Sequence, residues 1–124
     1  MKAVKSSSAP EPIGPYSQAF VEGNLVFVSG MIAIDPATNK MVMGVREQTQ
    51  RVLDSLKAVL EAAGSSEKKV LKTTVYLKDA SAFKEMNETY AKFFGDHKPA
   101  RATIVTAFPR DDILVEIDAV ASVQ

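Results

Sequence analysis

Two charged residues stand near the end of the chain, where the surrounding pattern calls for aliphatic side chains. Arg101 begins one apolar run and Glu116 lies in the middle of the next. A charge on an apolar strand is costly unless it is paired or binds something. A guanidinium grips a carboxylate through two parallel hydrogen bonds, each contributing about 1.5 to 3 kcal/mol. We therefore interpret Arg101 as a candidate binder of a substrate carboxylate.

Glu116 is the candidate general base. A carboxylate on a mostly apolar face has its pKa raised by desolvation, which suits it to take a proton from water and return it to a leaving amine. A plain ion pair or an exposed strand face remains the alternative reading of Glu116.

The two apolar runs are separated by residues 109–112, Pro-Arg-Asp-Asp, a pattern typical of a hairpin. In such a hairpin Arg101 would lie opposite about Val120, which is over about 10 Å from Glu116 at about 3.3 Å per residue. The two side chains would then either flank a small ligand or come from two different chains.

Composition excludes several classes of site. The chain has 15 basic and 15 acidic residues and a net charge of zero, with no basic cluster beyond Lys68-Lys69, so it lacks the electrostatic pattern of a nucleic-acid binder. It has no cysteine, and its one histidine rules out a multi-histidine metal site. His97 lies in Gly-Asp-His-Lys-Pro and is expected to be a solvated turn residue. No histidine base is therefore available to Ser29 for a serine-nucleophile mechanism.

The chain is expected to work away from membranes. No apolar stretch approaches the roughly 20 residues of a membrane span, and the start, Met-Lys-Ala-Val-Lys-Ser-Ser-Ser, has no secretory apolar region. We expect a cytoplasmic protein, with a mitochondrial location as the alternative if a presequence has been removed.

The elements that would position these residues can be placed by periodicity. Residues 1–15 are rich in Pro, Gly and Ser and predict an extended loop, and Gly23-Asn24 predicts a tight hairpin between strands at 18–22 and 25–29. The strand at 25–29 has no polar alternation, which indicates burial on both faces. Further on, we expect an amphipathic helix over about 46–63 ended by Gly64, a strand over 70–77, and a helix from a cap at Asp79 or Ser81 to Gly95.

Asn87 falls inside the apolar stripe of the second helix, whose other members are Phe83, Met86, Tyr90 and Phe94. A buried amide needs hydrogen-bond partners. A neighbouring loop or a bound substrate would supply them.

These elements predict one α+β domain over residues 1–124, a mixed β-sheet with two helices packed on one face. The strands at 25–29 and 113–121 carry apolar residues on both faces, so the second sheet face needs another subunit. The residues alone support only an oligomer.

Four segments, in order along the chain, resemble the RidA family, also called YjgF/YER057c/UK114. They are Pro12-Ile-Gly-Pro-Tyr-Ser-Gln-Ala19; Phe27-Val-Ser-Gly30 with Ile34-Asp-Pro36; Met86-Asn-Glu-Thr-Tyr90 to Phe94; and Pro99-Ala-Arg101 with Val115-Glu-Ile117. The resemblance implies a chorismate-mutase-like fold. It also implies a homotrimer with a barrel-like centre and a cleft between each pair of neighbouring chains.

The resemblance further implies an imine deaminase that needs no cofactor. Such proteins hydrolyse 2-iminobutanoate and 2-iminopropanoate, released by pyridoxal-phosphate dehydratases, to 2-oxo acids and ammonia. Carried over by position, Arg101 binds the substrate carboxylate, Glu116 activates water and the backbone of Thr103 holds the imine nitrogen. Tyr16 forms a lid or wall, Ser29 a polar contact and Asn87 a support behind them.

Two positions depart from the family pattern. Thr103 stands where many members have cysteine, which excludes thiol-based regulation, and Met31 stands where glutamine is common and is expected to be a core residue. Two other functions stay open: a non-catalytic trimer that binds small carboxylates or stabilises other proteins, and ribonuclease or translation inhibition. Neutral charge and the single histidine argue against the last.

Overall fold

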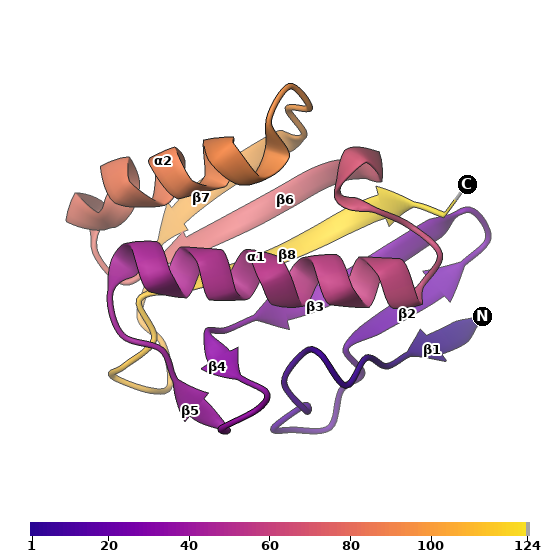
Figure 1. The fold of residues 1–124 in the computed structure, drawn as a ribbon, viewed down its shortest axis with the longest axis horizontal. Helices are drawn as coiled ribbons and strands as arrows, with labels where there is room; N and C mark the ends of the chain where they lie inside the picture. Colours follow the sequence, from indigo (N-terminus) through magenta and orange to yellow (C-terminus); the bar gives the residue numbers. More distant parts are fainter. Residues whose placement is uncertain (124) are drawn as a thin grey trace.

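A six-stranded mixed sheet carries both helices on one face (Figure 1), as expected for the α+β class. The computed structural model describes residues 1–123. The strands run β1 (Lys2–Val4), β2 (Ala19–Glu22), β3 (Leu25–Met31), β8 (Val115–Ser122), β6 (Val70–Leu77) and β7 (Ala100–Val105) across the sheet. The helices are α1 (Val45–Ala62) and α2 (Phe83–Phe94), and β4 (Ile34–Asp35) pairs with β5 (Lys40–Met41) in a small ribbon. Short 3-10 helices cover Glu67–Lys69 and Ala80–Ala82.

The expected hairpin between the last two strands is wrong. β6 lies between β7 and β8, parallel to β7 and antiparallel to β8. The physical reason is that α2 carries the chain over the sheet from β6 back to the same end, a crossover that makes β7 parallel to β6. Residues 106–114 are therefore a loop that passes β6 before β8 begins.

The expected loop over residues 1–15 is wrong at its start. Lys2–Val4 forms β1, which pairs antiparallel with β2 at the edge of the sheet. The Ser and Pro signals begin only after Val4, and the unpaired edge of β2 supplies hydrogen-bonding groups that local sequence does not reveal.

The strand at 25–29 is not buried on both faces within one chain. Val26 and Val28 are buried, whereas Phe27 between them is 47% exposed. Phe27 lies opposite Phe20 on β2 and Val120 on β8. One face of the sheet therefore keeps uncovered apolar side chains.

The helices and the sheet enclose the core. The buried stripe of α1 confirms the predicted helix, and Gly64, at a φ of 84°, follows its end. This stripe comprises Val52, Leu53, Leu56, Val59 and Leu60. Burying each such side chain contributes about 1.5 to 3 kcal/mol. Met31 is buried, as expected for a core residue.

The second helix also agrees with its prediction over most of its length. The carboxylate of Asp79 accepts a hydrogen bond from the Ser81 N–H at 2.9 Å, and Met86 is buried. Phe83, expected on the buried stripe, is instead 44% exposed at the start of α2.

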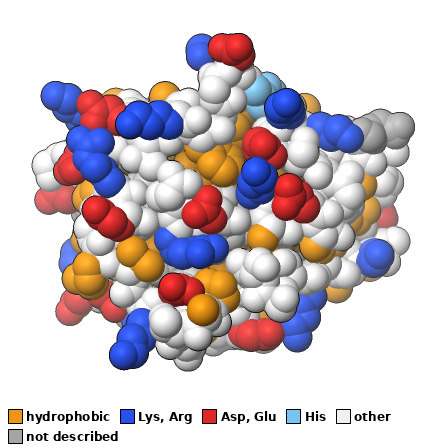
Figure 2. Space-filling view, viewed as in Figure 1, with side chains coloured by type: hydrophobic (Ala, Val, Ile, Leu, Met, Phe, Trp, Pro, Cys, Tyr) orange, Lys and Arg blue, Asp and Glu red, His pale blue; other side chains and the backbone are white. Residues whose placement is uncertain are grey.

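On the helix-covered side, positive and negative side chains are interspersed (Figure 2). Arg46 of α1 bridges to Glu85 at 3.1 Å and Glu88 at 2.7 Å, which joins the outer surfaces of the two helices. Among the described residues, no helix is long and apolar enough to cross a membrane.

Candidate functional site

Glu116 lies on the sheet face that the helices leave open. Its neighbours Val115 and Ile117 are buried under the helices, so alternation along β8 turns Glu116 to the other side. Its side chain packs directly over Gly30, where the pairing of β3 with β8 shifts between Val28 and Met31. A Cβ at position 30 would overlap Oε2 of Glu116 and come within 2.9 Å of its Cδ. The absence of a side chain at Gly30 therefore makes room for the carboxylate.

The carboxylate of Glu116 has no hydrogen bond or ion pair within residues 1–123, so the alternative of an ion pair inside the chain does not hold. Partial burial raises the pKa of Glu116, and the neighbouring negative charge of Asp118 raises this pKa further. Asp118 itself accepts hydrogen bonds from the Thr74 N–H and the Tyr76 hydroxyl. Glu116 is thus an unpaired, partly desolvated carboxylate suited to proton transfer.

A cavity of about 450 Å³ opens beside this carboxylate, and we call it the Glu116 pocket. It is lined by Ile13, Tyr16, Ser29, Gly30, Ile32, Pro109, Ile113 and Glu116. Three of the predicted site residues, Tyr16, Ser29 and Glu116, therefore meet here. Tyr16 is 48% exposed at its rim, and the Ser29 hydroxyl donates to the Ser17 carbonyl at 2.6 Å.

Arg101 lies on the other side of the sheet, against α2. Its Nη1 donates to Oδ1 of Asn87 at 2.7 Å, and its guanidinium lies over the rings of Tyr90 at 4.9 Å and Phe83 at 5.7 Å. The described partner of Asn87 is therefore Arg101 on a strand, and not a neighbouring loop. One amide and two aromatic faces hold the cation in place.

A second cavity, of about 350 Å³, adjoins Arg101 and is called the Arg101 pocket. His97 is among its lining residues, and its Nε2 lies 2.6 Å from the Val70 carbonyl oxygen. The expectation of a solvated His97 is thus wrong, because this contact and the Phe94 ring, with centroids 6.3 Å apart, hold it against the domain.

Thr103 lies two residues beyond Arg101 on β7, at the free edge of the sheet. The Thr106 N–H donates to the Leu77 carbonyl on β6, so alternation along the strand directs the backbone groups of Thr103 away from β6. Its side-chain Oγ1 is buried without a hydrogen-bond partner among the described residues. The Thr103 backbone is therefore free to bind a ligand at this edge.

The two pockets do not meet within one chain. Arg101 lies opposite Thr73 on β6, whereas Glu116 lies opposite Tyr76, three residues further along, and β6 separates their strands. Their side chains also leave opposite faces of the sheet. With strands about 4.8 Å apart, one small substrate cannot bridge them in a single chain. Arg101 and Glu116 are therefore apart within one chain, as expected, although the hairpin from which their separation was calculated does not exist.

Sequence reasoning missed two parts of this arrangement. The stacking of Arg101 has a signal in hindsight, since Phe83, Asn87 and Tyr90 follow at spacings of four and three on one helix face. The contact between Gly30 and Glu116 has no signal in the sequence beyond the presence of the glycine. Within residues 1–123 no cluster of three or more His, Cys, Asp or Glu side chains offers a metal site.

Comparisons with known proteins find relatives along almost the whole chain. Residues 6–123 match the family described as Endoribonuclease L-PSP. The RutC family protein PH0854 of Pyrococcus horikoshii is 49% identical over 97% of this chain and 96% of its own length. Reactive Intermediate Deaminase A, chloroplastic, of Arabidopsis thaliana is 40% identical over 98% of this chain and 65% of its own.

A solved structure also resembles this chain over almost its whole length. The crystal structure of E. coli TdcF with bound serine superposes with a TM-score of 0.94 and 35% identity, covering 98% of each chain. The family match covers almost the whole chain, and the sequence of one relative is 49% identical to it. This chain therefore belongs to the YjgF/RidA family.

Proposed function

We propose that this protein hydrolyses small 2-imino acids to 2-oxo acids and ammonia in clefts between the chains of a homotrimer. The observation that carries the proposal is the division of the site: a pinned cation on one face of the sheet and an unpaired carboxylate on the other. One relative is named a reactive intermediate deaminase, and the TdcF structure holds serine, whose carboxylate and nitrogen share the framework of a 2-imino acid.

Arg101 supplies the binding step. Asn87 occupies one of its N–H groups at 2.7 Å, which leaves the others to form paired hydrogen bonds with the substrate carboxylate. The Thr103 carbonyl, directed off the free edge of β7, accepts from the N–H of the protonated imine. These contacts place C2 of the substrate at the edge of the sheet.

Glu116 supplies the proton transfers. It takes a proton from a water molecule, whose oxygen forms a bond to C2 as the C=N electrons move to nitrogen. The same carboxyl then returns the proton to nitrogen and takes the proton of the new hydroxyl group as the C–N bond breaks. Ammonia and the 2-oxo acid leave, and the proton passes from the carboxyl to solvent. General base catalysis of this kind contributes about 10² to 10⁴-fold. No cofactor enters this scheme, since a protonated imine is already electrophilic.

The uncovered sheet supports an oligomer, and the homotrimer is the form that we propose for it. Phe27 is exposed on the open face with Phe20 and Val120 beside it, and Ile104 on the edge strand β7 is exposed as well. Covering these side chains by neighbouring copies would give the barrel-like centre and bring Arg101 of one protomer to Glu116 of the next.

The test is a coupled assay. A pyridoxal-phosphate threonine dehydratase is run with and without this protein, in the presence of a nucleophile that traps the imine. We expect faster 2-oxobutyrate release and less trapped product, and we expect Arg101→Ala to abolish both effects while the assembly stays intact. Full acceleration by Arg101→Ala would refute the role given to this cation.

Two other functions can be tested with the same protein preparation. Retention of a small carboxylate without turnover would favour a binding protein over an enzyme. RNA cleavage that survives Arg101→Ala combined with Glu116→Ala would favour the activity in the family's description, endoribonuclease. Because the net charge of the chain is zero, hydrolysis of a small imino acid is a better proposal than cleavage of RNA, which is a polyanion.

A further inference from the structure

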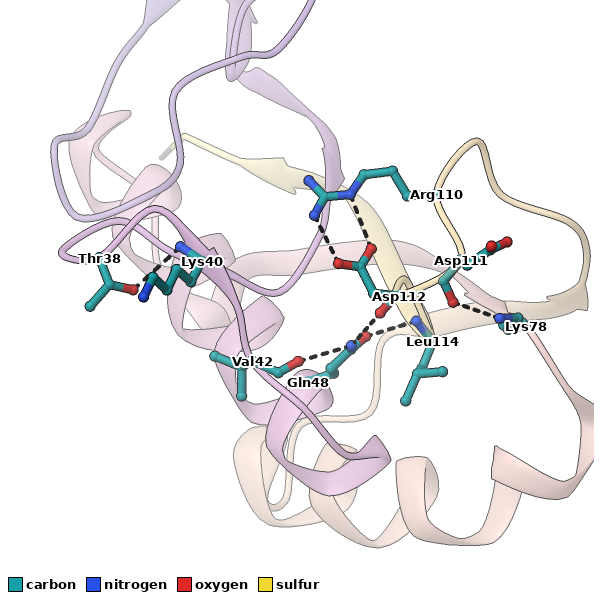
Figure 3. Close-up of polar contacts among 9 residues, drawn as sticks. All are labelled: Thr38, Lys40, Val42, Gln48, Lys78, Arg110, Asp111, Asp112 and Leu114. Atoms are coloured by element: carbon teal, nitrogen blue, oxygen red, sulfur yellow. Dashed lines mark hydrogen bonds and ion pairs between the residues drawn. The ribbon is translucent and has the colours of Figure 1, made fainter.

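A buried glutamine ties the first turn of α1 to the start of β8. Gln48 is 0% exposed, and its side-chain amide makes four hydrogen bonds, of which Figure 3 draws those to Val42, Asp112 and Leu114. Its Nε2 donates to the carbonyls of Val42 at 3.0 Å and Asp112 at 2.7 Å. Its Oε1 accepts from the N–H groups of Leu114 at 2.8 Å and Val115 at 3.2 Å. The full hydrogen-bonding capacity of the amide is therefore used.

These contacts fall immediately before the proposed base. Val115 precedes Glu116 on β8, and the loop that Gln48 holds also carries Pro109 and Ile113, which line the Glu116 pocket. Gln48 thus bonds to backbone on the segment that becomes one wall of the pocket and the strand bearing the carboxylate.

The other side-chain hydrogen bonds that hold this loop, within the described residues, lie at the surface. The Lys78 ammonium donates to the Asp111 carbonyl, and Arg110 pairs with Asp112 through two contacts of 3.0 and 2.8 Å (Figure 3). Exposed pairs of this kind contribute little and are screened by salt. The buried side chain of Ile113 and a hydrogen bond of 3.0 Å from the Lys78 N–H to the Leu114 carbonyl also hold the loop. Within residues 1–123, Gln48 is the buried polar side chain that bonds to it.

We propose that Gln48 is a positioning residue for the reaction, which sets where Glu116 and the adjoining pocket wall lie. The inference rests on the proposed function. It explains why an amide stands at this buried position: two carbonyls face one end of the side chain and two N–H groups face the other. A carboxylate would oppose its oxygen to the carbonyls of Val42 and Asp112, and an apolar side chain would leave four partly or fully buried backbone groups without this partner.

The experiment compares Gln48→Asn with wild type in the coupled assay. The shortened amide cannot reach both sets of backbone groups, so Glu116 loses its fixed position and kcat falls by about 10 to 100-fold. KM changes by less than about threefold, because Arg101 binds the carboxylate from the other half of the cleft. The acid limb of the pH profile moves to lower pH as water reaches Glu116, since burial is the main cause of its raised pKa.

Ser65→Ala is the matched control. The Ser65 hydroxyl donates to the Ser122 carbonyl at 2.6 Å, at the opposite end of β8 from Glu116. This control removes a hydrogen bond from the same strand, and we expect unchanged kcat and an unchanged acid limb.

Two further measurements keep the inference open to refutation if Gln48→Asn does not fold. Gln48→Met fills the same space with an apolar side chain and should show the same loss of kcat. In wild type, hydrogen exchange of the Leu114 and Val115 amides should be slow, and exchange as fast as in an exposed loop would overturn the inference.

The outcomes separate the two proposals. A wild type that does not accelerate imine hydrolysis would refute the proposed function. An active wild type, inactivated by Glu116→Gln but with full kcat and an unmoved acid limb in a folded Gln48 variant, would refute the role of Gln48 alone.

Discussion

A methyl group added at Gly30 should displace the carboxylate of the proposed base, Glu116, and so lower activity while the glutamate itself is unchanged. In the structure a Cβ at this position would overlap Oε2 of Glu116 and lie 2.9 Å from Cδ and 3.2 Å from Cγ. Ordinary carbon contacts are about 3.5 to 4.0 Å, so Gly30→Ala must move the carboxylate by about 1 Å. A displacement of this size costs about 10²-fold in rate, and overpacking costs about 1 to 3 kcal/mol of stability.

The assay is imine hydrolysis together with thermal unfolding at one protein concentration. Gly23→Ala is the control, because Gly23 lies in a surface turn at a φ of 59° with nothing near its would-be Cβ. It should lose stability through backbone strain and keep full activity. In a Glu116→Ala background the clash at Gly30 disappears, so Gly30→Ala should then cost little stability. Wild-type kcat in Gly30→Ala would refute the account of this carboxylate.

Three further predictions concern charge, orientation and assembly. Because burial raises the pKa of Glu116 in the folded chain, the folded state binds more protons than the unfolded state between their two pKa values, and this carboxyl lowers stability as pH rises through that window. Glu116→Gln should therefore raise Tm at neutral pH, with a gain that vanishes below the ordinary carboxyl range; an equal Tm at all pH values would contradict this. Asn87→Ala removes the 2.7 Å bond to Arg101 and should raise KM by about tenfold with a smaller change in kcat, and an unchanged KM in the coupled assay would count against this role. Phe27→Asp places a charge on the exposed apolar face and should yield folded, inactive monomers by sedimentation, whereas an intact oligomer would show that this face is not the interface.

Local pattern predicted the elements better than their pairing. The helices α1 and α2 and the strand β6 follow from periodicity and caps, and the structure places them close to the expected bounds. The turn signal at residues 109–112 correctly marked a loop but does not tell which strand pairs with β8. That choice depends on α2, which returns the chain to the far side of β6.

The site was partly predictable for a similar reason. Arg101 and Glu116 stood out as charges in apolar runs, so their types alone marked them. Gln48 did not, because a glutamine in an amphipathic helix resembles a surface residue. Three of its four partners lie 64 to 67 positions away, and only the folded chain brings them together.

The measurement that tests the central claim most directly is complementation between two inactive variants. Arg101→Ala and Glu116→Gln chains are unfolded together, reassembled in equal amounts and assayed for 2-oxo acid release. Because the two residues leave opposite faces of the sheet, an intact cleft needs a neighbouring pair of chains in the right order. Random assembly makes about one quarter of the clefts intact, so about one quarter of wild-type activity should return. Mixed trimers with no activity would show that the site does not lie between chains.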